Sequence, residues 1–181
     1  MKKILLSFFL FPSLCYAQGQ FYDRLAIDEV NKETKESIKR SYWQVFERGN
    51  LHRTMNTFYR LSCVNNSFYL DLKVMQGGDA FVVPRSGKFE LLLESGDIVT
   101  LNSTAFKASS KGDGSRHWAG SSAEGMTLTF PVSDDDMKLL LHDYVASIRL
   151  YSYEGFVQRK ITYNHSELFR DEVSLIYHAS R

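Results

Sequence analysis

Two stretches of strand-like sequence flank the pair Asn65-Asn66, and they limit the possible folds more than any other feature of the chain. Residues 67–76 alternate apolar and polar side chains with a period of two, which is typical of a strand with one buried face. Residues 54–64 form a second, mainly apolar run. Asparagine tolerates the left-handed backbone that a two-residue turn needs. The pattern therefore predicts an antiparallel hairpin over residues 54–76.

Further strands are predicted from short runs of aromatic, aliphatic and β-branched residues that turn residues separate. These runs cover residues 42–47, 80–83, 88–93, 98–101, 126–132, 145–152 and 156–163. Residues 95–97 and 153–155 each contain a glycine and supply the turn of a hairpin. The glycine- and serine-rich stretch 107–125 is predicted to be a long loop or a pair of irregular edge strands.

Two helices are predicted among these strands. The first begins at Ser133, before three consecutive aspartates, because serine caps a first turn and the helix dipole favours carboxylates there. Its inward side chains are expected to be Met137, Leu140 and Leu141. The second lies near the C-terminus, where Phe169, Val173, Ile176 and Tyr177 fall on one helical face. We expect it to cover an open sheet edge or the mouth of a barrel.

The combined pattern predicts a mainly β fold, either a β-sandwich or a partly closed antiparallel barrel, with a short inserted helix and a C-terminal helix. The length allows a single domain with a substantial core. We expect this domain to span residues 42–181. Residues 18–41 are charged and have only a thin apolar stripe, so they are predicted to form a polar arm or a marginal helix.

Residues 1–17 predict export from a bacterial cell. Lys2 and Lys3 precede the apolar run 4–14, and small residues lie at the two positions that a signal peptidase reads. The run is too short to remain as a permanent membrane span. Cleavage after Ala17 would place the mature chain in the periplasm or outside the cell.

The two cysteines lead to separate expectations. Cys15 could be acylated in a lipoprotein, but the bulky Leu14 before it disfavours this alternative. After cleavage only Cys63 remains, so the mature chain cannot form an intramolecular disulfide. Cys63 lies in a strand-like run and is expected to be a small buried side chain rather than a nucleophile. No second apolar stretch is long enough to span a membrane.

The charge balance argues against a nucleic-acid partner. The leader contains two of the 22 basic residues and none of the 21 acidic residues, which leaves a mature net charge of about −1. A near-neutral chain without a basic cluster lacks the electrostatic signature of nucleic-acid binding, and it offers nothing strong for an anionic membrane surface.

Three groups of segments together resemble a known class of proteins. Residues 67–75 lead into 81–93 and 96–101, residues 120–125 lead through a strand into 133–140, and residues 147–157 precede a closing helix. Over residues 55–180 the chain resembles a loose group of small exported bacterial β-rich proteins of unknown function. The shared motifs are structural, so the resemblance implies one secreted β-rich domain and assigns no catalytic residue.

Motifs for metals, nucleotides and catalysis are absent from the sequence. None of the five histidines (His52, His117, His142, His165 and His178) has the spacing of a local zinc site. The aspartates 134–136 lack the alternating ligands and the glycine of a calcium loop, so they fit helix capping better. There is no nucleophile elbow or phosphate-binding glycine loop. We therefore expect no metal and no cofactor.

The best candidate binding residues are Arg116, His117 and Trp118, which lie together in the glycine-rich stretch 107–125. Tryptophan and arginine are favoured anchors in binding sites. The alternative is that Trp118 packs under its own loop. The other tryptophan, Trp43, and its neighbour Tyr42 are expected to lie in the core.

These patterns favour an exported, non-enzymatic domain that binds a protein, a glycan or a small ligand, or that has a structural role at the cell envelope. One alternative is a barrel-like carrier of an apolar small molecule. Such a carrier would need an apolar cavity. An interior without a cavity, filled by Phe68, Leu70, Leu91, Leu128 and Ile148, would exclude it. A second alternative is a hydrolase whose catalytic residues are dispersed in the sequence.

Overall fold

The computed structural model describes residues 25–48, 55–77, 79–113 and 123–181. Its larger sheet has seven strands and is antiparallel. Six of them follow one another in the order β1 (Leu25–Val30), β2 (Ser37–Ser41), β4 (Asn56–Val64), β5 (Ser67–Gln76), β11 (Glu124–Val132) and β10 (Ser110–Lys111). The seventh, β3 (Gln44–Glu47), also pairs with β4, next to β2.

The predicted hairpin over residues 54–76 is confirmed as the strand pair β4–β5. Val64 pairs with Ser67, so the turn consists of two residues. Asn65 and Asn66 both have positive φ, at 49° and 64°, which is the left-handed geometry of a tight hairpin turn. This turn fixes the register of the whole pair, in which Arg60 lies opposite Asp71.

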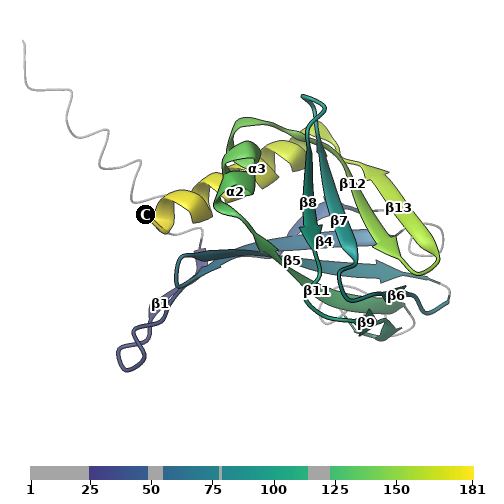
Figure 1. Ribbon diagram of the computed structural model, residues 1–181, viewed down its shortest axis with the longest axis horizontal. Helices are drawn as coiled ribbons and strands as arrows, with labels where there is room; N and C mark the ends of the chain where they lie inside the picture. The colour runs from purple at the N-terminus through teal and green to yellow at the C-terminus, as the bar shows by residue number, and fades with distance from the viewer. Residues whose placement is uncertain (1–24, 49–54, 78, 114–122) are drawn as a thin grey trace, which may run out of the picture.

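The second sheet has four strands and contains both of the other predicted hairpins. Its order is β13 (Gly155–Lys160), β12 (Val145–Ser152), β7 (Lys88–Leu93) and β8 (Ile98–Asn102). A two-stranded ribbon of β6 (Val82–Val83) and β9 (Lys107–Ala108) lies beside it (Figure 1). The stretch predicted as a loop or irregular edge strands therefore supplies two short strands, β9 and β10, in its described part.

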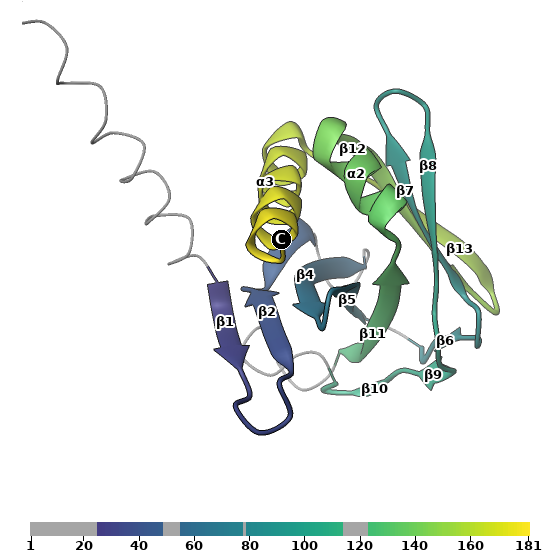
Figure 2. The same cartoon turned by 60° about the vertical axis from the view of Figure 1, so that its left-hand side comes forward.

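The two sheets enclose a wedge that two helices fill (Figures 1 and 2). The first is α2 (Asp134–His142), which follows β11 of the larger sheet and precedes β12 of the second sheet in the chain. The other is α3 (Tyr163–Ala179), near the C-terminus. Helix α3 packs against α2 and against strands of both sheets, including β4 and β12. The predicted class is confirmed as mainly β with an inserted and a C-terminal helix, and neither sheet closes into a barrel.

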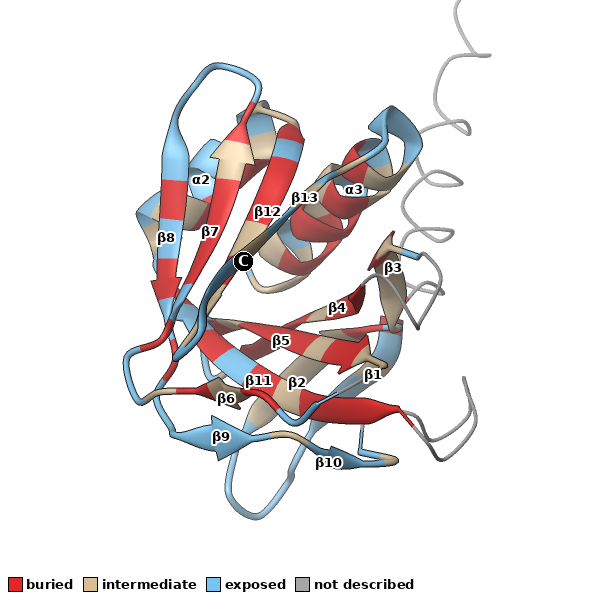
Figure 3. Ribbon diagram, turned by 90° about the vertical axis from the view of Figure 1, so that its right-hand side faces the viewer, coloured by how far each residue is buried: buried red, intermediate tan, exposed pale blue. Residues whose placement is uncertain are grey.

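An aromatic cluster joins the layers of this core. The ring centroid of Phe46 on β3 lies 4.2 Å from Tyr59 on β4 and 4.8 Å from Phe169 on α3. Phe89 on β7 reaches across to Phe130 on β11, with 5.4 Å between centroids. The inner faces of both sheets and of α3 are accordingly buried (Figure 3).

The core also contains the five side chains whose packing was expected to decide whether the protein has a carrier's cavity. Phe68, Leu70, Leu91, Leu128 and Ile148 are all buried and belong to this one cluster. The side chains expected to decide the carrier alternative are therefore packed into the core, and that alternative stays an untested prediction. Cys63 is 4 % exposed and lies in the same cluster, as predicted for a small structural side chain.

The start of α2 has the predicted cap. Ser133 Oγ accepts a hydrogen bond of 3.0 Å from the backbone N–H of Asp136, and the three aspartates occupy the first turn. Met137 and Leu140 are buried, and Leu141 packs against the core from a partly buried position. The local sequence therefore determines both where this helix begins and which face it buries.

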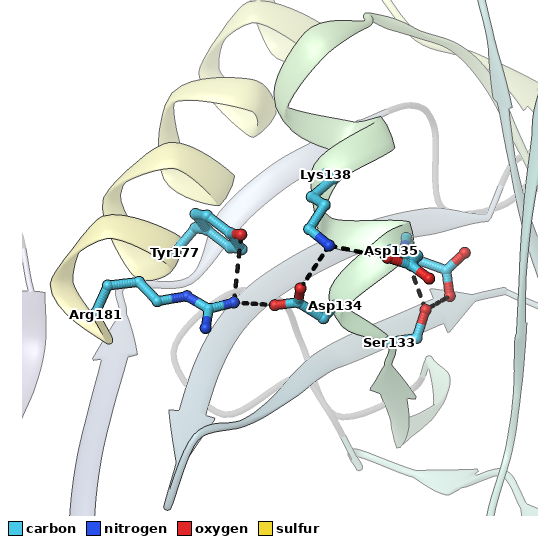
Figure 4. A network of polar contacts seen from close by, with 7 residues as sticks. Ser133, Asp134, Asp135, Lys138, Tyr177 and Arg181 are labelled. Atoms are coloured by element: carbon cyan, nitrogen blue, oxygen red, sulfur yellow. Dashed lines mark hydrogen bonds and ion pairs between the residues drawn. The ribbon is translucent and has the colours of Figure 1, made fainter.

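A polar network ties the end of α3 to the start of α2 (Figure 4). Arg181 donates to Asp134 and to Tyr177, and Lys138 contacts Asp134 at 2.8 Å. The hydrogen bond from Lys138 and the nearby Arg181 guanidinium hold the pKa of Asp134 below its ordinary value of 3.8. The network thus links α3 to α2 on the solvent-exposed side of their contact.

Replacing Asp134 by asparagine is expected to lower stability slightly at neutral pH. The lowered pKa means that the contribution of Asp134 is present above its ordinary pKa and is lost as the pH falls through the lowered value. The groups are exposed, so the effect is small and screened by salt. Urea unfolding at neutral pH and in acid would check this. A difference from wild type that persisted in acid and in high salt would contradict it.

One alternative predicted for residues 18–41, a marginal helix, is wrong for the part that the structure describes. The described part, residues 25–41, forms the antiparallel strands β1 and β2, with Asp28 and Lys39 paired at 2.8 Å. Because β2 also pairs with β4, these residues extend the sheet that was expected to begin at residue 42. The leader, including Cys15, lies outside the described residues. Within the described part of the chain, no helix is both long and apolar enough to cross a membrane.

Candidate functional site

The sequence-predicted site residues Arg116, His117 and Trp118 lie outside the described residues. The structure describes the two ends of their loop, where β10 pairs with the first residues of β11. Ser110 lies opposite Gly125 and Lys111 opposite Glu124. The loop therefore leaves and rejoins the larger sheet at the edge formed by β10 and β11.

The other tryptophan, Trp43, lies on the outer face of the larger sheet rather than in the predicted core position. It directly precedes β3, in which Gln44 lies opposite Tyr59, so Trp43 continues the register opposite Arg60. Its neighbour Tyr42 is 55 % exposed, and Trp43 itself is partly exposed. The expectation that these two aromatic side chains belong to the core is wrong.

Two cations contact the indole of Trp43. The guanidinium carbon of Arg60 lies 4.5 Å from the ring centroid, and the Lys73 Nζ lies 4.4 Å from it. Cation–π contacts of this kind are favourable and also fix the orientation of the ring. We call Trp43, Arg60, Asp71 and Lys73 the Trp43 site.

Asp71 holds one of these cations in place. Its Oδ2 accepts hydrogen bonds from Arg60 Nη2 at 2.6 Å and from Arg60 Nε at 3.1 Å. Its Oδ1 accepts a hydrogen bond of 2.7 Å from Thr129 Oγ1 on β11. The side chain of Asp71 is only 10 % exposed. Side chains from β4, β5 and β11 therefore together hold the Arg60 guanidinium against the Trp43 ring.

Lys73 is the cation of the Trp43 site that forms no ion pair with a described residue. Burial lowers its pKa from the ordinary value, and the neighbouring Arg60 charge lowers it further, while Asp113 acts in the opposite direction. No described residue forms an ion pair with Lys73. A partly desolvated ammonium that forms no ion pair gains from binding an anion.

The root of the 107–125 loop lies over the same face of the sheet. Gly125 and Thr127 on β11 share this outer face, and Thr127 lies opposite Lys73. The carbonyl oxygen of Asp113 occupies the space that a Cβ on Gly125 would need. Only glycine admits this close approach. The loop that carries the sequence-predicted residues therefore begins next to the Trp43 site.

A second polar cluster lies on the outer face of the four-stranded sheet. Arg149 Nη1 donates to Glu90 at 2.9 Å, and the hydroxyl of Tyr151 donates to the same carboxylate oxygen at 3.1 Å. Arg149 also donates twice to Gln158, at 3.3 Å and 3.0 Å. The polar groups of this cluster form hydrogen bonds with one another across β7, β12 and β13. We therefore interpret the cluster as a structural network.

The described histidines do not converge. His142 ends α2, His178 lies in the last turn of α3, and His165 Nδ1 lies 3.1 Å from the carbonyl oxygen of Phe46. Among the residues that the structure describes, no three histidine, cysteine, aspartate or glutamate side chains are grouped so that they could hold a metal ion. His52 and His117 lie outside the described residues.

No protein-family model matches the chain, and no curated protein or solved structure gives a significant match to it. The resemblance to exported β-rich proteins stays a prediction. A functional proposal for this chain therefore has to start from the chemistry of its own surface.

Proposed function

We propose that this protein is an exported, non-enzymatic β domain that binds an acidic glycan at the Trp43 site. The signal-like residues 1–17 support export to the periplasm or the cell exterior. The partly exposed side chains of Trp43, Arg60 and Lys73 on the outer face of the larger sheet support binding of a ligand that approaches from solvent. The observation that carries the proposal is Lys73, an unpaired cation held against a partly exposed tryptophan.

The chemistry of the Trp43 site suits a sugar that bears a carboxylate. An indole face packs well against the apolar face of a sugar ring, and Lys73 supplies a charge-assisted contact for the carboxylate. Hydroxyl groups of Thr127, Thr129 and Tyr69 lie on the same face of the sheet. They offer donors and acceptors for the hydroxyl groups of the sugar.

Titration calorimetry with a galacturonic acid hexamer would test the proposal. Replacing Trp43 by alanine, or Lys73 by methionine, is expected to weaken binding at least about tenfold, because each removes an anchor of the site. Lys73→Met keeps most of the side chain's volume and removes its charge. Circular dichroism would verify that each variant is folded.

Two comparisons separate the site from a general charge effect. Lys160→Met removes one exposed charge from the four-stranded sheet and is expected to leave binding unchanged. A neutral maltose-series hexamer should bind more weakly than the galacturonic acid hexamer. Equal loss in Lys73→Met and Lys160→Met, or no binding of the acidic hexamer, would refute the proposal.

A further inference from the structure

A third cation, Arg40, lies on the same outer face as the Trp43 site. Strand β2 pairs with β4 so that Arg40 is opposite Ser62, and Ser62 shares its face of β4 with Arg60. Arg40 is partly buried, and its Nε atom has no hydrogen-bond partner. Within the described residues Arg40 forms no ion pair. It is the second cation on this face, after Lys73, that forms no ion pair with a described residue.

The strand registers place the three cations in a line. Arg40 on β2, Arg60 on β4 and Lys73 on β5 are each one strand across and two residues along from the next. With the usual strand spacing and rise, neighbouring members of this line are about 8 Å apart, and its ends are about 16 Å apart. We call these three residues the basic diagonal.

We propose that the ligand is an extended acidic polysaccharide that lies along the basic diagonal, with Arg40 binding an acidic group at a distance from the Trp43 site. This inference rests on the proposed function. Arg40 and Lys73, which form no ion pair with a described residue, lie at opposite ends of the line, while Asp71 neutralises the Arg60 between them. A single sugar cannot span a separation of about 16 Å. A chain with repeated carboxylates can reach both ends.

A length series of ligands tests this inference. Titration calorimetry would compare monomeric galacturonate with the galacturonic acid hexamer, using protein purified from cells that express the full chain. The hexamer is expected to bind at least about tenfold more tightly than the monomer, because it adds the contact with Arg40. Arg40→Met should remove most of this gain and change monomer binding less than about twofold.

The outcomes distinguish this inference from the proposed function. Equal affinity for monomer and hexamer, or an equal loss of both in Arg40→Met, would overturn the extended-chain inference and leave the proposed function standing. No binding of either ligand would overturn both. If a poly-glutamate peptide bound more tightly than the hexamer, the inferred ligand would be an acidic protein segment, and the glycan would be ruled out. Lys160→Met serves again as the charge-matched control.

Discussion

Replacing Phe46 by alanine is expected to destabilise the protein by about 3–5 kcal/mol, the usual cost of removing a fully buried phenylalanine. Phe46 is fully buried, and its ring contacts Tyr59, Phe89 and Phe169. Its loss would leave a cavity where both sheets and α3 meet. Since natural domains are stable by only about 5–15 kcal/mol, much of the margin would be lost. Urea unfolding followed by circular dichroism would measure the change.

Two variants show whether the cost belongs to the core position. Phe46→Leu keeps most of the volume and is expected to cost less than about 1.5 kcal/mol. Phe106→Ala removes the same ring from a site that is 57 % exposed, and a change within about 0.5 kcal/mol is expected there. If Phe46→Ala unfolded at the wild-type urea midpoint, the aromatic cluster would not be the junction that the structure describes.

The elements that the sequence predicted well are those whose signals are local. A two-residue Asn65-Asn66 turn sets the β4–β5 register by itself, and Ser133 caps α2 without help from distant residues. The strands of residues 25–41 lack such a signal. Their side chains are mostly polar, and β2 is held by its pairing with β4, a contact that sequence periodicity does not encode.

The Trp43 site was missed for a related reason. Once the two-residue turn is assumed, counting outward from it already pairs Arg60 with Asp71 and places Lys73 on the same face. The position of Trp43 could not be obtained in this way. It depends on β3 pairing with the first residues of β4, where Gln44 lies opposite Tyr59, and no local sequence signal specifies this pairing. An aromatic residue beside a strand is most often buried, and here the sheet pairing directs it outward.

Replacing Asp71 by alanine is the second large effect that we expect, about 2–3 kcal/mol of lost stability. The change removes both hydrogen bonds to Arg60 and the one from Thr129. It also leaves the Arg60 guanidinium, only 23 % exposed, beside the positive charge of Lys73 without a counter-charge. Urea unfolding at neutral pH would measure the loss.

A double-mutant cycle decides whether that loss of stability comes from the unpaired charge of Arg60. Adding Arg60→Met to Asp71→Ala removes the unpaired guanidinium, so the double variant is expected to be more stable than Asp71→Ala alone. Asp28→Ala breaks a more exposed ion pair with Lys39, whose aspartate is 40 % exposed, and it should cost less than about 1 kcal/mol. If the double variant were less stable than Asp71→Ala, Arg60 would stabilise the sheet through its packing under Trp43 rather than burden it as an unpaired charge.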